Sequence, residues 1–281
     1  MRSKNDARTV IQNILAVIIV VAFLVILLFP VFYLISTSLK PQSEAFAYPP
    51  KWIFKPTLIN YRNVLQSKDF FGGMVNSLVI CLTATVLSAL VGAMAAYGFS
   101  RYDFKGKSDL NFFILSIRMF PPIVAVIPYF LMANQFGLKD TKTLMVIVYM
   151  TFSIAFATWV LKVFFDSIPR EIDESALVDG FNPWQVFFRI ILPMAKPGFF
   201  SVTILNLIFA WNEFLFALVL TGNRAHTLPT IASGYIKTEG VVWGEMTAAG
   251  VLIALPMVIF AICIRRYLVT GLTLGAYKHR L

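Results

Sequence analysis

The feature that most constrains this chain is a series of long apolar runs, broken in its second half by a single long charged segment. Six runs approach or exceed the roughly 20 apolar residues that a membrane-spanning helix needs, and only Glu213 interrupts one of them. Only 14% of the residues are charged, far fewer than a water-soluble domain of 281 residues carries. We therefore predict an all-α membrane protein with six transmembrane helices, in residues 9–39, 70–100, 119–138, 143–161, 197–223 and 246–264.

The distribution of basic residues predicts the orientation. With an even number of spans, both termini lie on one side, together with residues 101–107 and 162–196. That side holds 14 Lys and Arg, the opposite loops hold 9, and Arg118 lies within a span. The excess places both termini in the cytoplasm. The formal net charge of +10 is dispersed among these loops, which argues against a nucleic-acid-binding surface.

Residues that often carry chemistry are isolated in this sequence. A Gly106-Lys107-Ser108 tripeptide resembles the end of a phosphate-binding loop, but Arg101 stands where that pattern requires a glycine. The cysteines lie in separate predicted spans, and the histidines lie on opposite sides of the membrane. We therefore predict neither an ATP site, nor a metal site, nor catalysis based on Cys81, Cys263, His226 or His279.

The charged segment, residues 168–198, is called the elbow below. It reads IPREIDESALVDGFNPWQVFFRIILPMAKPG. Gly180 suits a left-handed helix end, and Asn182 with Gln185 has the spacing of a capping box. Pro193 should end the second helix, because it lacks a backbone donor and clashes with the preceding turn. The pattern predicts two short helices that meet at a sharp turn.

The first elbow helix has an apolar ridge at Ile168, Ile172 and Ala176, flanked by acidic residues. One interpretation is an amphipathic helix at the membrane surface with a solvated acidic face. Helices that lie on membranes usually carry basic residues on their polar face. The acids therefore favour a protein partner: Glu171, Asp173, Glu174 and Asp179.

Two spans show signs of close packing or of a break. Ser88, Gly92 and Ala96 recur at a spacing of four, which allows close contact with another helix. The third span contains Pro121-Pro122 and Pro128, which interrupt backbone hydrogen bonds. Such interruptions are tolerated where protein or a wet cavity satisfies the freed carbonyls. We predict that the third span is part of the pore.

Four polar residues within the spans are candidates for the translocation path: Arg118, Asn206, Asn212 and Glu213. Intramembrane charge is costly and usually faces a bundle interior or an aqueous path. Asn206 lies seven positions before Glu213, two helical turns away on nearly the same face. The alternative is a buried salt bridge between Glu213 and Arg118, and the sequence leaves both interpretations open.

The elbow also resembles a known motif. The spacing of Glu174, Ala176, Gly180, Ile190, Leu192 and Pro193 is similar to the EAA loop in permease subunits of bacterial binding-protein-dependent ABC importers. Ser175 stands where that pattern usually has Ala, and Phe181 where a small residue commonly follows the Gly. The segments RMFPP, GLKDT, WNEFLFALVLT and GLTLGAYK resemble carbohydrate-uptake permeases of the maltose-importer type, specifically the second, six-span subunit.

The resemblance implies a type I ABC importer permease fold with cytoplasmic coupling helices, in a bacterial inner membrane. Its implied organisation is 1–72 for the tail, first span and polar segment, 73–268 for the permease core with a coupling loop at 166–198, and 269–281 for a cytoplasmic tail. Coupling to the ATPase would fall to Glu174, Ser175, Ala176, Asp179, Gly180, Phe181, Ile190, Leu192 and Pro193. The tail residues that contact the ATPase would be Gly271, Leu272, Thr273, Gly275 and Lys278.

The implied partners are a related but non-identical permease, two copies of a cytoplasmic ABC ATPase, a periplasmic or extracellular solute-binding protein, and a sugar-like solute. The chain itself has no implied cofactor or catalytic residue, because ATP and Mg²⁺ bind to the ATPase. An importer of polyamines or inorganic anions remains an alternative. A stand-alone channel or secondary carrier is another, although a carrier needs ion-coupling carboxylates and only Glu213 is available.

Overall fold

The computed structural model describes residues 2–237 and 240–276, with side chains at 12–236 and 240–262. Most of the described chain is helical. A short antiparallel pair, β1 (Ile236–Lys237) and β2 (Gly240–Val241), makes up the described sheet. The chain forms two compact units. The first combines Met1–Ser67 with Ala232–Ala254, and the second combines Lys68–Ile231 with Leu255–Leu281.

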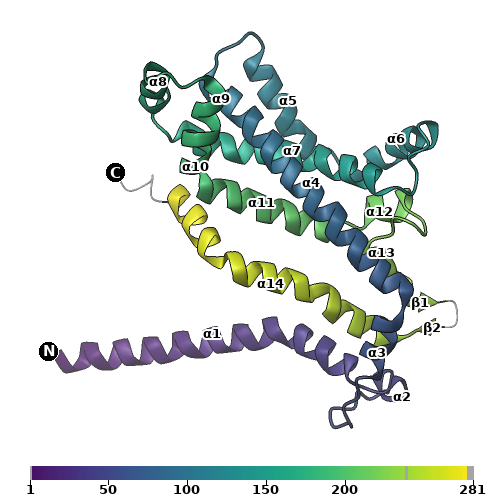
Figure 1. The fold of residues 1–281 in the computed structure, drawn as a ribbon. Helices are drawn as coiled ribbons and strands as arrows, with labels where there is room; N and C mark the ends of the chain where they lie inside the picture. The colour runs from purple at the N-terminus through teal and green to yellow at the C-terminus, as the bar shows by residue number, and fades with distance from the viewer. Residues whose placement is uncertain (1, 238–239, 277–281) are drawn as a thin grey trace. The chain divides into compact units, whose positions relative to one another are not determined.

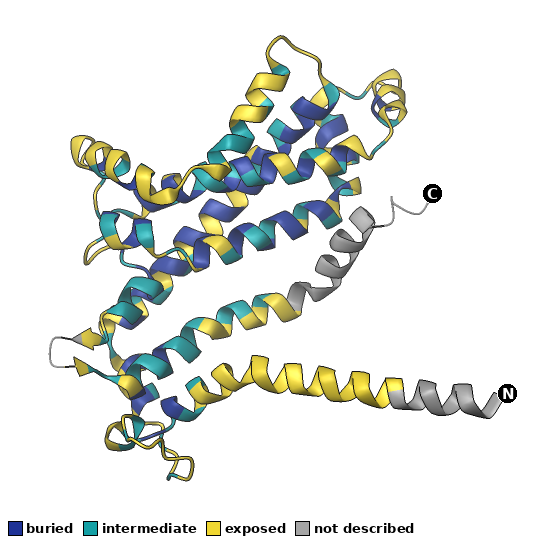
Figure 2. Ribbon diagram, turned by 180° about the vertical axis from the view of Figure 1, so that it is seen from behind, coloured by how far each residue is buried: buried dark blue, intermediate teal, exposed yellow. Residues whose placement is uncertain are grey.

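The first unit is dominated by α1 (Arg2–Ser38), whose described apolar side chains are mostly exposed, as Figure 2 shows. An apolar helix with such exposure suits contact with lipid. Beyond it, α2 (Gln42–Ala45) and α3 (Ile59–Gln66) form a small packed end. There the Lys40 ammonium is buried and lies 5.2 Å from the Phe54 ring centroid and 5.7 Å from that of Tyr33. Asn60 holds the same turn by donating to the carbonyls of Ser38 and Lys40.

The core of the second unit consists of α4 (Lys68–Arg101), α7 (Lys142–Asp166) and α11 (Lys196–Trp211), which pack against one another (Figure 1). The predicted stripe of small residues is buried here. A Cβ atom at Gly92 would lie 2.4 Å from the Cβ of Ala157, so only glycine allows this approach of α4 to α7. The prediction of close helix packing is confirmed.

The six apolar runs do not all form straight helices. Among the described residues, four helices are long and apolar enough to cross a membrane: Gln12–Ser38, Lys68–Arg101, Lys142–Asp166 and Trp243–Ile262. Two further pairs are bent, by 95° between α5 (Lys107–Met119) and α6 (Pro122–Gln135), and by 80° between Pro183–Met194 and α11. The number of spans is therefore six if each bent pair counts as one.

The first bend follows from the sequence. Phe120 and Pro121 have extended backbone, and Pro122 opens α6 in its first turn, where a missing N–H is tolerated. The break falls at the start of the predicted third span, and the helix before it carries Arg118. The chain then continues through α12 (Leu215–Leu220), α13 (Leu228–Ser233) and α14 (Trp243–Ala276).

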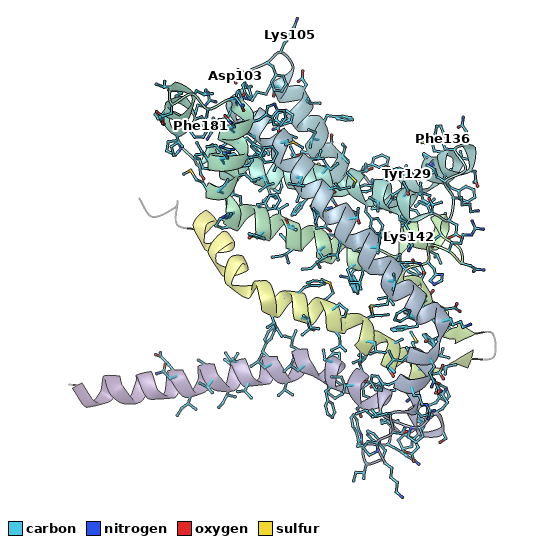
Figure 3. All side chains as sticks on the ribbon, in the orientation of Figure 1. Asp103, Lys105, Tyr129, Phe136, Lys142 and Phe181 are labelled. Carbon is cyan, nitrogen blue, oxygen red and sulfur yellow. The ribbon has the colours of Figure 1, made fainter. Side chains whose placement is uncertain are left out.

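The two ends of the second unit are distinct. Figure 3 shows Asp103, Lys105 and Phe181 at one end, and Phe136 and Lys142 at the other. The elbow and the turn between α4 and α5 therefore share one end, called the elbow end below. This agrees with the sequence-based prediction that both segments lie on the same side of the membrane.

At the opposite end, Asp140 fixes the turn before α7. Its backbone has φ of 59°, and its carboxylate accepts backbone N–H groups of Gly222 at 2.7 Å, Ala225 at 2.9 Å and Arg224 at 3.1 Å. Partial burial raises the pKa of this carboxyl, but the three backbone donors outweigh it, so the pKa lies below its ordinary value. The ionised carboxylate thus ties this turn to the segment that follows α12.

Candidate coupling and translocation sites

The elbow has the predicted two-helix form. Its first helix, α8 (Arg170–Val178), is followed by the left-handed Gly180, which has φ of 86°. The capping box is present, because Asn182 Oδ1 accepts the backbone N–H of Gln185 and Gln185 Oε1 accepts that of Asn182, both at 2.9 Å. The left-handed turn and the second helix start are therefore confirmed.

The second elbow helix ends slightly later than predicted. It comprises α9 (Pro183–Gln185), a π-helical turn η1 (Val186–Ile191) and α10 (Leu192–Met194). Pro193 does not end it, because this residue occupies the first turn of α10, where its missing N–H costs little. The bend of 80° follows at Ala195, before α11 begins.

One face of the elbow packs into a core at the elbow end. Ala176 from α8 and Phe187 and Ile191 from η1 are buried against Tyr97 of α4 and Phe165 of α7. Ile168 and Ile172 pack against the same cluster, as the predicted apolar ridge requires. The elbow is therefore held to the helix bundle by apolar burial, its largest stabilising contribution.

The predicted coupling residues divide between this core and the surface. Glu174, Ser175, Asp179 and Gly180 are exposed, Phe181, Ile190, Leu192 and Pro193 are half-buried, and Ala176 is buried. The exposed surface also carries apolar side chains at Val178 and Trp184. The elbow thus presents an acidic and apolar face. Asp173 departs from the predicted acidic surface: it is buried, and its carboxylate lies 2.9 Å from Arg101 Nε.

A cavity of about 210 Å³ lies within the second unit, where α5, α7, α11 and α12 meet. Its polar groups are Arg118, Tyr149, Ser153 and Glu213. Most of the remaining lining is aromatic, and the full apolar set is Phe120, Pro122, Phe152, Phe209, Ala210 and Phe216. A mainly aromatic wall with a few polar groups is typical of a small-molecule site.

Glu213 is fixed by three hydrogen bonds. Its carboxylate accepts the backbone N–H groups of Phe216 at 2.8 Å and Ala217 at 3.2 Å, which caps the start of α12. The Tyr149 hydroxyl donates to the same carboxylate at 3.0 Å. Tyr149 was not among the predicted residues, although a tyrosine within an apolar span is a signal for a polar partner.

Arg118 does not reach Glu213. Its guanidinium carbon lies 4.4 Å from the Phe209 ring centroid and 4.9 Å from that of Phe156, which is the geometry of cation–π stacking. Among the residues with described side chains, no ion pair joins Arg118 to Glu213. The structure therefore favours a shared cavity over the salt bridge that the sequence left open.

The two asparagines lie outside this lining. Asn206 is fully buried and donates to the Ser153 carbonyl at 3.1 Å, which ties α11 to α7. Asn212 is exposed and donates to the Ile208 carbonyl of its own helix at 2.8 Å.

Most of the predicted tail residues belong to the last helix. The backbone of Gly271, Leu272, Thr273 and Gly275 belongs to α14, but their side chains lie outside the described set, and Lys278 lies outside the described residues altogether. Within the part of the chain that the structure describes, no three His, Cys, Asp or Glu side chains cluster as a metal site would require.

The apolar spans, the two bent helix pairs and the exposed elbow define a multi-pass membrane permease subunit. Residues 88–273 match the family described as the binding-protein-dependent transport system inner membrane component. The chain belongs to this family, the permease subunits of ABC importers, and is therefore an inner-membrane transport component and not an enzyme.

Curated relatives span almost the same length. The chain is 36% identical to the trehalose transport system permease protein SugB of Mycobacterium tuberculosis, over 89% of this chain and 92% of that one. It is 33% identical to the trehalose/maltose transport system permease protein MalG of Thermococcus litoralis, over 96% and 98%. Its fold is similar to a chain of a bacterial ABC transporter that imports the acidic polysaccharide alginate, with a TM-score of 0.77, 22% identity and coverage of 92% and 96%. The type I importer permease fold is confirmed.

Proposed function

We propose that this chain forms half of the translocation path of an ABC importer for a sugar or a related polyhydroxylated solute. The observation that carries the proposal is the cavity at Arg118, Tyr149 and Glu213, whose remaining wall is largely aromatic. A sugar ring has apolar C–H faces that stack on aromatic rings and hydroxyl groups that need hydrogen-bond partners at its edge. The relatives named for trehalose and maltose transport support the same solute class.

The polar groups of the cavity have different roles in this proposal. The Glu213 carboxylate already accepts three hydrogen bonds, so it mainly holds the cavity wall in place. Arg118 is stacked on two rings, which leaves its N–H groups available to donate hydrogen bonds to solute oxygens. Asn206 supports the path from outside the cavity by fixing the contact of α11 with α7, and the exposed Asn212 extends the path at the end of α11.

The elbow is the proposed contact with the energy source. Its exposed residues, including Glu174 and Asp179, offer an acidic and apolar face to a cytoplasmic ABC ATPase. ATP and Mg²⁺ bind to two copies of that ATPase, and both termini of this chain lie in the cytoplasm. Tail residues Gly271, Leu272, Thr273, Gly275 and Lys278 reach the same partner.

The other half of the path comes from a non-identical permease, and a solute-binding protein on the far side of the membrane delivers the solute. When the ATPase dimer closes, the elbows move with it and the spans open outward. Alternating access of this kind needs an elbow that is firmly attached to the spans, as the buried core at Ala176, Phe187 and Ile191 provides.

The test uses the complete complex in lipid nanodiscs, with the binding protein, second permease and ATPase of the same importer. Trehalose, maltose, spermidine and sulfate are compared for stimulation of ATP hydrolysis. We expect stimulation by a sugar, and a reduction of at least five-fold in stimulation with Phe209→Ala, because this ring forms part of the cavity wall and supports Arg118. Phe23→Ala, on the exposed surface of α1, is the control. Stimulation by spermidine or sulfate alone would reject the sugar class.

A further inference from the structure

A buried ion pair joins the elbow to α4. The side chains of Asp173, on α8, and Arg101, at the end of α4, are 10% and 7% exposed, and Asp173 Oδ2 lies 2.9 Å from Arg101 Nε. The Tyr97 hydroxyl, one turn earlier on α4, donates to Asp173 Oδ1 at 2.7 Å. Tyr97, Arg101 and Asp173 are called the buried ion-pair cluster below.

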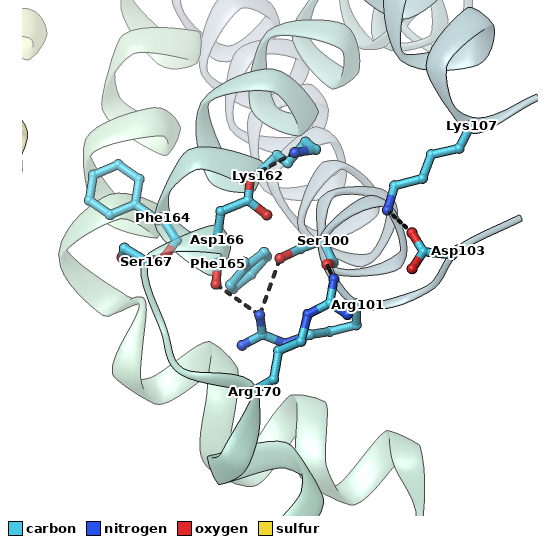
Figure 4. Close-up of polar contacts among 10 residues, drawn as sticks. All are labelled: Ser100, Arg101, Asp103, Lys107, Lys162, Phe164, Phe165, Asp166, Ser167 and Arg170. Atoms are coloured by element: carbon cyan, nitrogen blue, oxygen red, sulfur yellow. Dashed lines mark hydrogen bonds and ion pairs between the residues drawn. The ribbon is translucent and has the colours of Figure 1, made fainter.

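The same arginine also reaches α7. Its two terminal nitrogens donate to two carbonyls, each at 3.1 Å: that of Phe165, in the last turn of α7, and that of Ile168, just beyond the helix end. Figure 4 shows the bond to Phe165. The Phe165 carbonyl lies at the negative end of the α7 dipole, which favours a cation. A second bond links α8 to α4, because Arg170, at the start of α8, donates to the Ser100 carbonyl near the end of α4 at 3.1 Å. Three helices are thereby connected at one point.

Burial makes this connection different from the ion pairs on the surface. Lys107 with Asp103 and Lys162 with Asp166 are i,i+4 pairs with more exposed side chains, which contribute little because water and salt screen them. A buried charge that loses its partner stays desolvated and uncompensated, which is strongly unfavourable. A displacement of α8 away from α4 would therefore leave the buried Arg101 without its partner, at a large cost in free energy.

The apolar surroundings restrict the cluster further. The Tyr97 ring centroid lies 5.1 Å from that of Phe187 on the elbow and 6.1 Å from that of Phe165 on α7. Tyr97 therefore contacts both the elbow and α7 through its ring while its hydroxyl binds Asp173. A sliding movement of α8 would disturb packing and hydrogen bonding together.

We propose that the buried ion-pair cluster makes α8 and the adjoining ends of α4 and α7 move as one body, so that movement of the elbow is transmitted to the spans. Asp173 is thus a positioning residue that acts through Arg101, distinct from the exposed residues that face the ATPase. The proposal rests on the proposed function, because transmission has meaning only if the elbow is moved by an ATPase.

The test measures solute transported per ATP hydrolysed in proteoliposomes that contain the complete complex. Asp173→Asn keeps the size of the side chain and an acceptor for Tyr97 but removes the charge opposite Arg101. We expect this ratio to fall at least five-fold, with transport reduced more than hydrolysis. Asp173→Glu retains the charge and should keep more than half of the wild-type ratio. Asp103→Asn, the same change in an exposed pair, is the matched control and should leave the ratio unchanged.

A role in folding alone predicts a different result. It would lower transport and hydrolysis in equal proportion to the amount of assembled complex, with an unchanged ratio, and that result would contradict the proposal. If Asp173→Asn fails to assemble, Tyr97→Phe decides, since it removes one hydrogen bond and keeps the ion pair. We expect about a two-fold lower ratio, and a wild-type ratio would contradict the proposal. Absence of solute-stimulated hydrolysis in the wild-type complex would instead reject the proposed function.

Discussion

The Tyr149 hydroxyl donates a hydrogen bond of 3.0 Å to the Glu213 carboxylate, which joins the middle of α7 to the turn between α11 and α12. The same carboxylate caps α12 through two backbone N–H groups. One acidic residue just beyond the end of α11 therefore fixes the cavity wall, the start of a helix and a contact between two helices.

Removal of this carboxylate should destabilise the cavity wall. Glu213→Ala leaves the N–H groups of Phe216 and Ala217 and the Tyr149 hydroxyl without their acceptor. We expect a loss of at least about 1 kcal/mol in the free energy of unfolding, the usual effect of losing a helix cap. Thermal unfolding of the purified protein in detergent measures it. Asn212→Ala removes only a bond within α11 and should have little effect, so equal losses would contradict the role of Glu213.

The approach of α4 to α7 should tolerate no side chain at Gly92. Leucine there would collide with Ala157, because even its Cβ atom would lie 2.4 Å from that of Ala157. We expect Gly92→Leu to cost about 1–3 kcal/mol or more from overpacking, and to reduce the yield of folded protein. Gly98→Ala is the control, since no atom lies within 4 Å of the added Cβ and alanine favours a helix. A stable Gly92→Leu protein would contradict the close packing.

Acidification should weaken the turn at Asp140. Its folded-state pKa is lowered, so its contribution to stability is complete above the unfolded pKa of about 3.9 and is lost as the pH falls through the folded pKa. Asp140→Asn tolerates the left-handed backbone but cannot ionise. We expect this variant to be less stable than wild type at pH 7, with the difference shrinking below pH 4. Unfolding measured across pH 3–7 checks it, and a constant difference would contradict the ionised carboxylate.

The left-handed turn of the elbow should be specifically required for coupling. Gly180 and Gly106 have φ of 86° and 81°, and a Cβ atom at either position would meet nothing within 4 Å. Alanine at either site therefore introduces a similar backbone strain, about 1–2 kcal/mol. We expect Gly180→Ala to lower ATP-driven uptake several-fold and Gly106→Ala to leave it near wild type. Equal effects on uptake would show that the elbow geometry has no special role.

Local features of the elbow could be predicted from the sequence because their causes are local. A glycine at the helix end and the Asn182 and Gln185 pair depend on residues within a few positions, and both occur as expected. The apolar ridge at Ile172 and Ala176 follows from helical periodicity in the same way. Pro193 was misjudged because its effect depends on where it falls within a helix, and it falls in a first turn.

Contacts between distant segments could not be derived from periodicity. Asp173 and Arg101 are 72 positions apart, and nothing in the spacing of the acids distinguishes the buried one except its position three residues before the ridge residue Ala176. Arg118 and Glu213 could be singled out as charged residues among apolar runs. Their side-chain partners could not, because these depend on the bend at Pro121 and on particular rings among 27 phenylalanines.

In the mechanism we propose, this permease subunit moves solute with energy supplied through its elbow by a separate ATPase. The most direct measurement is accumulation of labelled sugar in proteoliposomes that hold the permease pair and binding protein, with and without the ATPase, and with Glu174→Lys. We predict accumulation above the external concentration only with the ATPase, and its loss in Glu174→Lys, because this exposed acid on α8 reverses its charge. Concentrative uptake without the ATPase, or undiminished uptake by Glu174→Lys, would contradict the account.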